Sequence, residues 1–140
     1  MTLDDNSKDR LHDVFFYGLY MAPEILELKG VVPRNPRQGS VEGFELRIGN
    51  KATLLRAKGK TSYGMVYSLK HDEIYSLYHG AGLMEYAAEA VAVNIENEII
   101  SALCCNLMCP PKDNESNHEY EHKLKTAMKE LGLPWLQAAE

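Results

Sequence analysis

The chain has 140 residues, 45% of them hydrophobic, and its 20 acidic and 15 basic residues give a net charge of -5 at pH 7. A chain of this length fits one domain, buries roughly two thirds of its unfolded surface and should fold unaided. The acidic balance argues against nucleic acid or an anionic membrane as a partner. No apolar run approaches the ~20 residues of a spanning helix and the first ten residues are polar, so we expect a cytoplasmic protein.

Residues 1–12 are expected to form a loose N-terminal arm and residues 13–140 a single domain, because no repeat or linker divides the chain. Residues 14–21, VFFYGLYM, combine an apolar run with a glycine, which predicts a buried strand and a tight turn. Residues 23–29 then have the pattern of a short helix that ends before Gly30. Such a junction directs backbone N–H groups toward a space where they can bind an anion or a carbonyl oxygen.

Most of the middle of the chain is predicted to form short strands. Residues 31–39 contain two prolines among polar residues, which indicates a loop. Residues 40–48 and 51–56 have the pattern of a hairpin. Residues 61–69 are a third predicted strand, in which Gly64 marks a bulge or a close contact.

The second half of the chain is predicted to supply two more strands and two helices. Residues 71–78 have helical spacing, whereas residues 87–95 and 98–107 are continuous apolar runs that indicate strands buried on both faces. Residues 117–131 are the last predicted helix, with an apolar stripe that should pack on the sheet. We therefore expect an α+β fold in which a small mixed β-barrel with flanking helices buries the strands.

Three cysteines, Cys104, Cys105 and Cys109, lie close together in the sequence. Their odd number does not suit a disulfide framework. Cys104 and Cys105 are neighbours in a predicted strand and would face opposite sides of the sheet, which argues against a shared metal site. We interpret the three cysteines as buried reduced thiols.

Residues 118–122, HEYEH, match the H-E-x-x-H pattern of zinc peptidases. Helical geometry places both histidines opposite the apolar stripe that contains Tyr120, so they should face water. Ser116 and Glu119 also fit a capping box, which gives the glutamate a structural role. We therefore interpret the motif as part of a solvated helix face and expect no metal site.

The order of these segments resembles that of the γ-glutamylcyclotransferase-like proteins. The resemblance rests on the strand that ends in Tyr17 and Gly18, the hairpin GFELRIGNKATL, the strand GMVYSL, the helix leading to LYHGAGLMEY, and the closing KELGLPW. It covers nearly the whole chain from Val14 onward. It implies a compact mixed β-barrel with flanking helices, and an activity that cyclises a γ-glutamyl amide or amino acid to 5-oxoproline.

The resemblance also implies where the chemistry would take place. The substrate's own α-amine attacks its γ-carbonyl, so one carboxylate can move both protons while backbone amides stabilise the oxyanion. The substrate-binding residues implied by the resemblance are Tyr17, Gly18, Leu19, Tyr20 and Tyr86. The expected partner is a small γ-glutamyl-type molecule bound by a monomer or homodimer, and no cofactor is expected.

Two positions depart from the family's pattern. Leu19 replaces the family's serine, and the segment that should carry the family's glutamate contains Gly80 and Ala81 but no carboxylate. Glu85 and His79 are the catalytic candidates that remain, although an exposed glutamate at a strand edge and a histidine that caps a helix are ordinary structural features. Two functions stay open: an active cyclotransferase with a relocated acid, and a catalytically silent small-molecule-binding or protein-interaction module, which would make the chain a pseudoenzyme.

Overall fold

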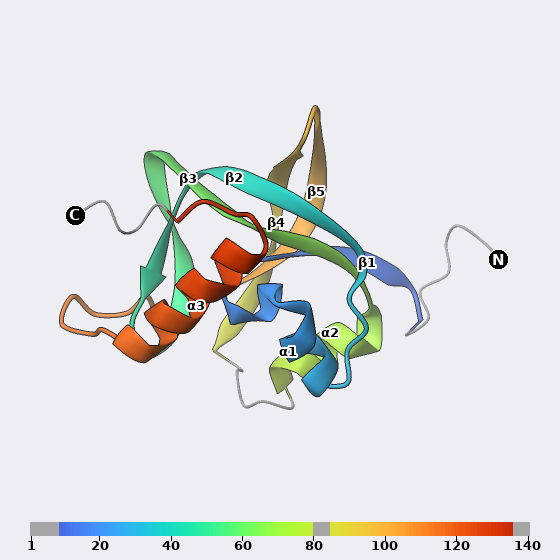
Figure 1. The fold of residues 1–140 in the computed structure, drawn as a ribbon, viewed down its shortest axis with the longest axis horizontal. Helices are drawn as coiled ribbons and strands as arrows, with labels where there is room; N and C mark the ends of the chain where they lie inside the picture. The colour runs from blue at the N-terminus through green and yellow to red at the C-terminus, as the bar shows by residue number, and fades with distance from the viewer. Residues whose placement is uncertain (1–8, 80–84, 136–140) are drawn as a thin grey trace.

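The computed structural model describes residues 9–79 and 85–135, and its strands form a closed barrel (Figure 1). The order of strands around the barrel is β1-β3-β2-β4-β5. All neighbouring strands with several paired residues are antiparallel, while β1 and β5 pair in parallel. The predicted mixed barrel is therefore confirmed. The strands are β1 (Leu11–Phe16), β2 (Arg34–Ile48), β3 (Ala52–Lys70), β4 (Tyr86–Ile95) and β5 (Glu98–Leu107).

Helices cover one end of the barrel. In Figure 1 they lie below the strands, whereas the β4–β5 hairpin projects at the top. The predicted helices are confirmed within the described residues, and none of those helices has the length and apolarity to cross a membrane. They are the 3₁₀ turn η1 (Leu19–Met21), α1 (Pro23–Leu28), α2 (His71–His79) and α3 (His118–Glu130).

The core fills the barrel and the space beneath the helices. Leu26 of α1 and Leu124 of α3 are both fully buried, so each helix packs one apolar face against the barrel. Strands β1 and β3 approach closely at Gly64, where a Cβ atom would collide with the backbone carbonyl of Phe16. The close contact predicted at this glycine is confirmed. It holds the last residue of β1 against β3, directly before the chain turns into η1.

The loop predicted for residues 31–39 is wrong, because β2 begins at Arg34 and pairs there with Ser68 of β3. The pairing is irregular between Arg34 and Arg37, and Asn35 adopts a φ of 53°. A bulge of this kind removes the proline at position 36 from the regular hydrogen-bond ladder. The local proline signal therefore marks an irregularity inside a strand.

β4 is buried on one face only, which corrects the prediction that both of its faces are covered, whereas β5 is buried on both faces from Cys104 to Asn106, as predicted. Val91, Val93 and Ile95 are buried, while the residues between them are more exposed. The exposed face of β4 carries alanines, which made the run apolar although their small side chains tolerate water. β3 is also longer than expected, since it joins the two strands predicted at residues 51–56 and 61–69. Cys104 and Cys105 are buried, but Cys109 is exposed, which corrects the interpretation of all three cysteines as buried.

The starts of the first strand and of the last helix differ slightly from the predicted positions. β1 begins at Leu11, so the last two residues of the predicted arm belong to the barrel, and residues 1–8 lie outside the described part of the chain. The helix cap predicted at Ser116 is wrong, because Asn117 accepts the hydrogen bond from the backbone N–H of Tyr120 at 3.1 Å. The two histidines of the HEYEH motif are exposed, as helical geometry predicts.

Candidate ligand-binding cavity

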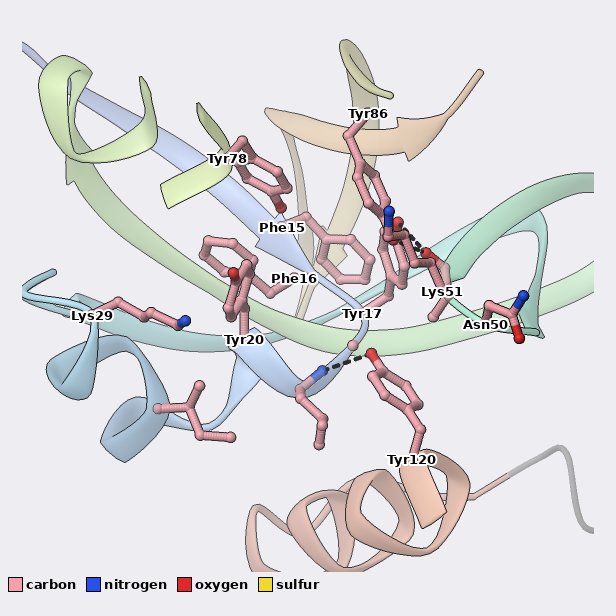
Figure 2. A pocket seen from close by; sticks show the side chains of 14 residues that line it. Phe15, Phe16, Tyr17, Tyr20, Lys29, Asn50, Lys51, Tyr78, Tyr86 and Tyr120 are labelled. Atoms are coloured by element: carbon pink, nitrogen blue, oxygen red, sulfur yellow. Dashed lines mark hydrogen bonds between the residues drawn. The ribbon is translucent and has the colours of Figure 1, made fainter. Parts of the chain in front are cut away.

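A cavity of about 280 Å³ lies at the turn between β1 and η1 (Figure 2). This volume is just below the roughly 300–1,000 Å³ of typical small-molecule sites, so the cavity suits a small ligand. Half of the residues that line it are aromatic. The aromatic lining residues are Phe15, Phe16, Tyr17, Tyr20, Tyr78, Tyr86 and Tyr120.

The aromatic rings of the wall hold one another in place. Tyr20 packs edge-to-face against Phe16 at 6.1 Å and 90°, and against Tyr78 at 5.9 Å and 85°. Tyr78 also contacts Tyr86, with ring centroids 5.7 Å apart. Burial raises the pKa of Tyr20, Tyr78 and Tyr86, so these hydroxyls stay protonated at neutral pH. The wall is therefore a preformed apolar surface with neutral hydroxyl groups.

Two of the tyrosine hydroxyls bind the barrel itself. Tyr17 donates a hydrogen bond of 2.6 Å to the carbonyl of Cys105 in β5, and Tyr86 donates one of 2.6 Å to the carbonyl of Ala52 in β3. These bonds fix the ends of three strands around the cavity. Because both hydroxyl hydrogens are already used, Tyr17 and Tyr86 contribute mainly their rings to a ligand.

The first loop contacts α3 through a residue that is distant in the sequence. The backbone N–H of Leu19 donates to the hydroxyl oxygen of Tyr120 at 3.1 Å, as Figure 2 shows. A Cβ atom on Gly18 would collide with the same hydroxyl. Gly18 has an extended backbone with a φ of -110°, so glycine is needed here for close approach and not for an unusual dihedral angle. One amide expected to bind a ligand directly is thus occupied by Tyr120.

Two lysines contribute positive charge to the cavity. Lys29 follows α1 and Lys51 lies in the turn before β3, and Figure 2 shows them on opposite sides of the aromatic cluster. The ammonium group of Lys51 forms an ion pair of 2.8 Å with Glu85. Among the described residues, no carboxylate pairs with Lys29, and none lines the cavity. Sequence reasoning identified neither of these lysines nor Tyr120.

The structure brings together the five predicted substrate-binding residues. Tyr17, Gly18, Leu19, Tyr20 and Tyr86 all line the cavity, although they come from two distant parts of the chain. No ligand tests their roles, which stay predictions.

The two catalytic candidates lie away from the cavity wall. Glu85 is exposed, and its hydrogen bond with Lys51 lowers the pKa of the carboxyl, which keeps it ionised at neutral pH. His79 is also exposed; its ring stacks on Tyr75 with centroids 3.9 Å apart, and Nδ1 lies 3.1 Å from the Tyr75 carbonyl. Gly80 and Ala81, where the family's glutamate was expected, lie outside the described residues.

The fold is similar to that of known proteins although the sequence is not. No family model and no curated protein matches the chain. Its structure is similar to a solved γ-glutamyl cyclotransferase, with a TM-score of 0.74 and 20% identity over 89% of this chain and 82% of the other. The chain has the γ-glutamylcyclotransferase-like fold. This confirms, at the level of the fold, the resemblance indicated by the order of segments.

Two further structures with the γ-glutamylcyclotransferase-like fold have similar coverage. A mouse AIG2-like protein has a TM-score of 0.59 and 16% identity, with 82% of this chain and 94% of that chain covered. A yeast γ-glutamyl cyclotransferase specific to glutathione has a TM-score of 0.63 and 12% identity, with 93% and 91% covered. The TM-scores establish the shared architecture, and because the identities are this low, activity has to be argued from the residues of the cavity.

Proposed function

We propose that this chain binds a small carboxylate-bearing molecule of the γ-glutamyl type in the cavity and does not turn it over. The observation that carries the proposal is the composition of the wall, which has two lysines and, among the described residues, no carboxylate. The fold shared with γ-glutamyl cyclotransferases supports the ligand class. A lysine ammonium near an apolar wall supports binding of an organic anion.

The lack of turnover is inferred from the proton transfers that cyclisation needs. A base must take a proton from the attacking amine, and an acid must give one to the leaving nitrogen. Glu85 and His79 lie off the wall, and protonated tyrosines with raised pKa values are weak bases. Removing a general acid or base typically lowers the rate by about 10² to 10⁴.

A second candidate function is a cyclotransferase that uses Glu85. The observation in its favour is that Glu85 is bound to Lys51, whose side chain does line the cavity. A rearrangement of this ion pair on ligand binding would bring a carboxylate closer to the wall. The two functions differ in product formation, so a direct assay separates them.

The test is to incubate the protein with a panel of γ-glutamyl amino acids and amines and to measure 5-oxoproline. We expect no 5-oxoproline above the uncatalysed rate, together with a ligand-dependent rise in melting temperature. A ligand at 100 times its Kd adds about 2.7 kcal/mol to the free energy of unfolding, which a thermal shift detects easily.

Three variants sharpen the result. Lys51→Met should reduce the thermal shift, while Glu85→Gln and His79→Ala should keep it. Release of 5-oxoproline by the wild type that disappears in Glu85→Gln would establish the second candidate function instead. Absence of both product and thermal shift across the panel would overturn the proposal.

A further inference from the structure

We infer that the cavity selects carboxylic acids that have a flat apolar body and lack a free amino group, such as a ring-closed or N-acylated γ-glutamyl compound or an arylalkanoic acid. This inference rests on the proposed binding function and narrows its ligand class. A free γ-glutamyl compound carries an α-ammonium beside its carboxylate, so we expect such zwitterions to bind at least about tenfold more weakly than the ammonium-free acids. It follows from a count of the hydrogen-bond donors and acceptors that face the cavity.

The donors are plentiful. Lys29 has no carboxylate partner among the described residues, and Lys51 forms one hydrogen-bonded ion pair, with Glu85, so both ammonium groups retain N–H hydrogens for a ligand. Tyr120 supplies another donor, because its oxygen accepts from the Leu19 amide while its own hydrogen has no acceptor among the described residues. These groups suit the oxygen atoms of a carboxylate.

The acceptors on the wall are neutral groups, namely the Asn50 side-chain amide and the oxygens of the tyrosine hydroxyls. No carboxylate lines the cavity among the residues that the structure describes. The loop carbonyls are also neutral and already accept one hydrogen bond each: Gly18 accepts from the amide of Met21 at 2.9 Å, and Leu19 accepts from that of Ala22 at 3.1 Å. The carbonyl of Ala52 accepts from Tyr86. An ammonium group carries only donors, so in this cavity it would lose its water without gaining strong acceptors.

The aromatic wall does not compensate for this loss. Aromatic faces attract cations, but the Lys29 ammonium, which has no carboxylate partner among the described residues, opposes the entry of a second positive charge into the same small cavity, and Glu85 already pairs with Lys51. Because Tyr20 packs edge-to-face against Phe16 and Tyr78, some ring edges and faces in this group contact one another instead of the cavity. The remaining apolar surface suits a flat hydrocarbon or lactam ring.

Tyr120 has a specific place in this recognition. Its hydroxyl oxygen accepts the hydrogen bond of the Leu19 amide, which would otherwise be available to a ligand. The hydroxyl hydrogen of Tyr120 then replaces that amide as the donor to the ligand. A carboxylate oxygen that binds the Tyr120 hydroxyl would also polarise the bond from Leu19, since hydrogen bonds in a chain strengthen one another. Tyr120 is therefore assigned as a binding residue for the carboxylate.

The experiment compares ligands that share a skeleton, by calorimetric titration of the full chain. 3-Phenylpropionate, phenylalanine and 3-phenylpropionamide differ only in the amino group and the carboxylate, and 5-oxoproline and glutamine form a second matched pair. We expect each ammonium-free acid to bind at least about tenfold more tightly than its zwitterionic or amide counterpart. A tenfold change in affinity corresponds to the energy of about one charge-assisted hydrogen bond.

The variants Lys51→Met and Tyr120→Phe should each weaken 3-phenylpropionate by about five- to tenfold and leave 3-phenylpropionamide nearly unchanged. Lys60→Met, which removes an exposed lysine that does not line the cavity, is the matched control and should bind as the wild type does. Unchanged melting temperatures without ligand would show that the variants remain folded.

The outcomes distinguish this inference from the function on which it rests. Equal or tighter binding of phenylalanine and glutamine overturns the inference and leaves carboxylate binding in place. Failure of every acid to bind overturns both. Release of 5-oxoproline from glutamine overturns the absence of turnover, while the ratio of the two measured affinities still decides the inference.

Discussion

The polar groups of this protein are used differently in two regions. In the first region, which we call the arginine cluster, each carboxylate pairs with an arginine; the cluster consists of Asp13, Arg34, Arg37, Ser68 and Glu73. The second region, the cavity wall, has two lysines and, within the described chain, no carboxylate. Arg34 binds Glu73 at 2.9 Å, and Arg37 binds Asp13 at 2.8 Å. The cluster joins β1, β2, β3 and α2, so its charges are used to hold the fold together.

Glu73 illustrates how completely the cluster satisfies its charges. Its carboxylate accepts hydrogen bonds from Arg34 and from the backbone N–H groups of Lys70 and Val32, at 2.8 to 3.1 Å. Burial raises the pKa of this carboxyl, but the hydrogen bonds outweigh burial and leave the pKa below its usual value. In the cavity, by contrast, Lys29 and the hydroxyl hydrogen of Tyr120 have no such partners among the described residues. We conclude that hydrogen-bond donors without a protein partner indicate where a ligand binds, whereas charged groups that are already paired do not.

The largest expected effect comes from breaking the arginine cluster. Glu73→Gln leaves Arg34 without its carboxylate, and we expect the free energy of unfolding in urea to fall by about 2 kcal/mol. Ligand affinity at the cavity should not change. Glu119→Gln is the matched control, because its exposed pair with Lys123 contributes at most about 0.5 kcal/mol. A weakened ligand affinity in Glu73→Gln would show that the two regions are coupled.

A smaller effect is expected from acid. Hydrogen bonds from Arg37 and Ser68 lower the pKa of Asp13, as those from Arg34 and the backbone lower that of Glu73. Because the unfolded chain then binds more protons, the stabilisation is fully present above the unfolded pKa values of about 4 and is lost as the pH falls through the lower folded values. The stability gap between wild type and Glu73→Gln, measured in urea titrations, should therefore stay constant from pH 7 to about pH 5 and narrow below about pH 4. A gap that widens in acid would contradict the assignment.

The smallest effect concerns the ion pair beside the cavity. Glu85 and Lys51 are both substantially exposed, so Glu85→Gln should leave the free energy of unfolding almost unchanged. The same change frees Lys51 and should increase the affinity for 3-phenylpropionate about two- to threefold, measured by calorimetry. Glu98→Gln, at an exposed position away from the cavity, controls for net charge. A loss of affinity in Glu85→Gln would mean that Glu85 itself contacts the ligand.

Local signals predicted the elements that form the first part of the site. The apolar run before Gly18 and the proline at position 23 are sufficient to specify a strand, a turn and a helix, because each signal acts on neighbouring residues. The same local reasoning was wrong for residues 31–39. There the prolines indicated a loop, but pairing with β3 and a bulge kept the segment in the barrel.

The sequence by itself determined most of the strands and helices and the aromatic loop of Tyr17 to Tyr20, since periodicity and turn chemistry are properties of short segments. The mixed barrel followed from the need to bury several short strands and from the order of the segments. Only the tertiary structure decided which donors surround the cavity. Tyr120 meets Leu19 across 101 positions of the chain, and Lys51 is drawn to Glu85 across 34. Such contacts depend on how α3 and the strand ends pack around the barrel, and no local pattern encodes that packing.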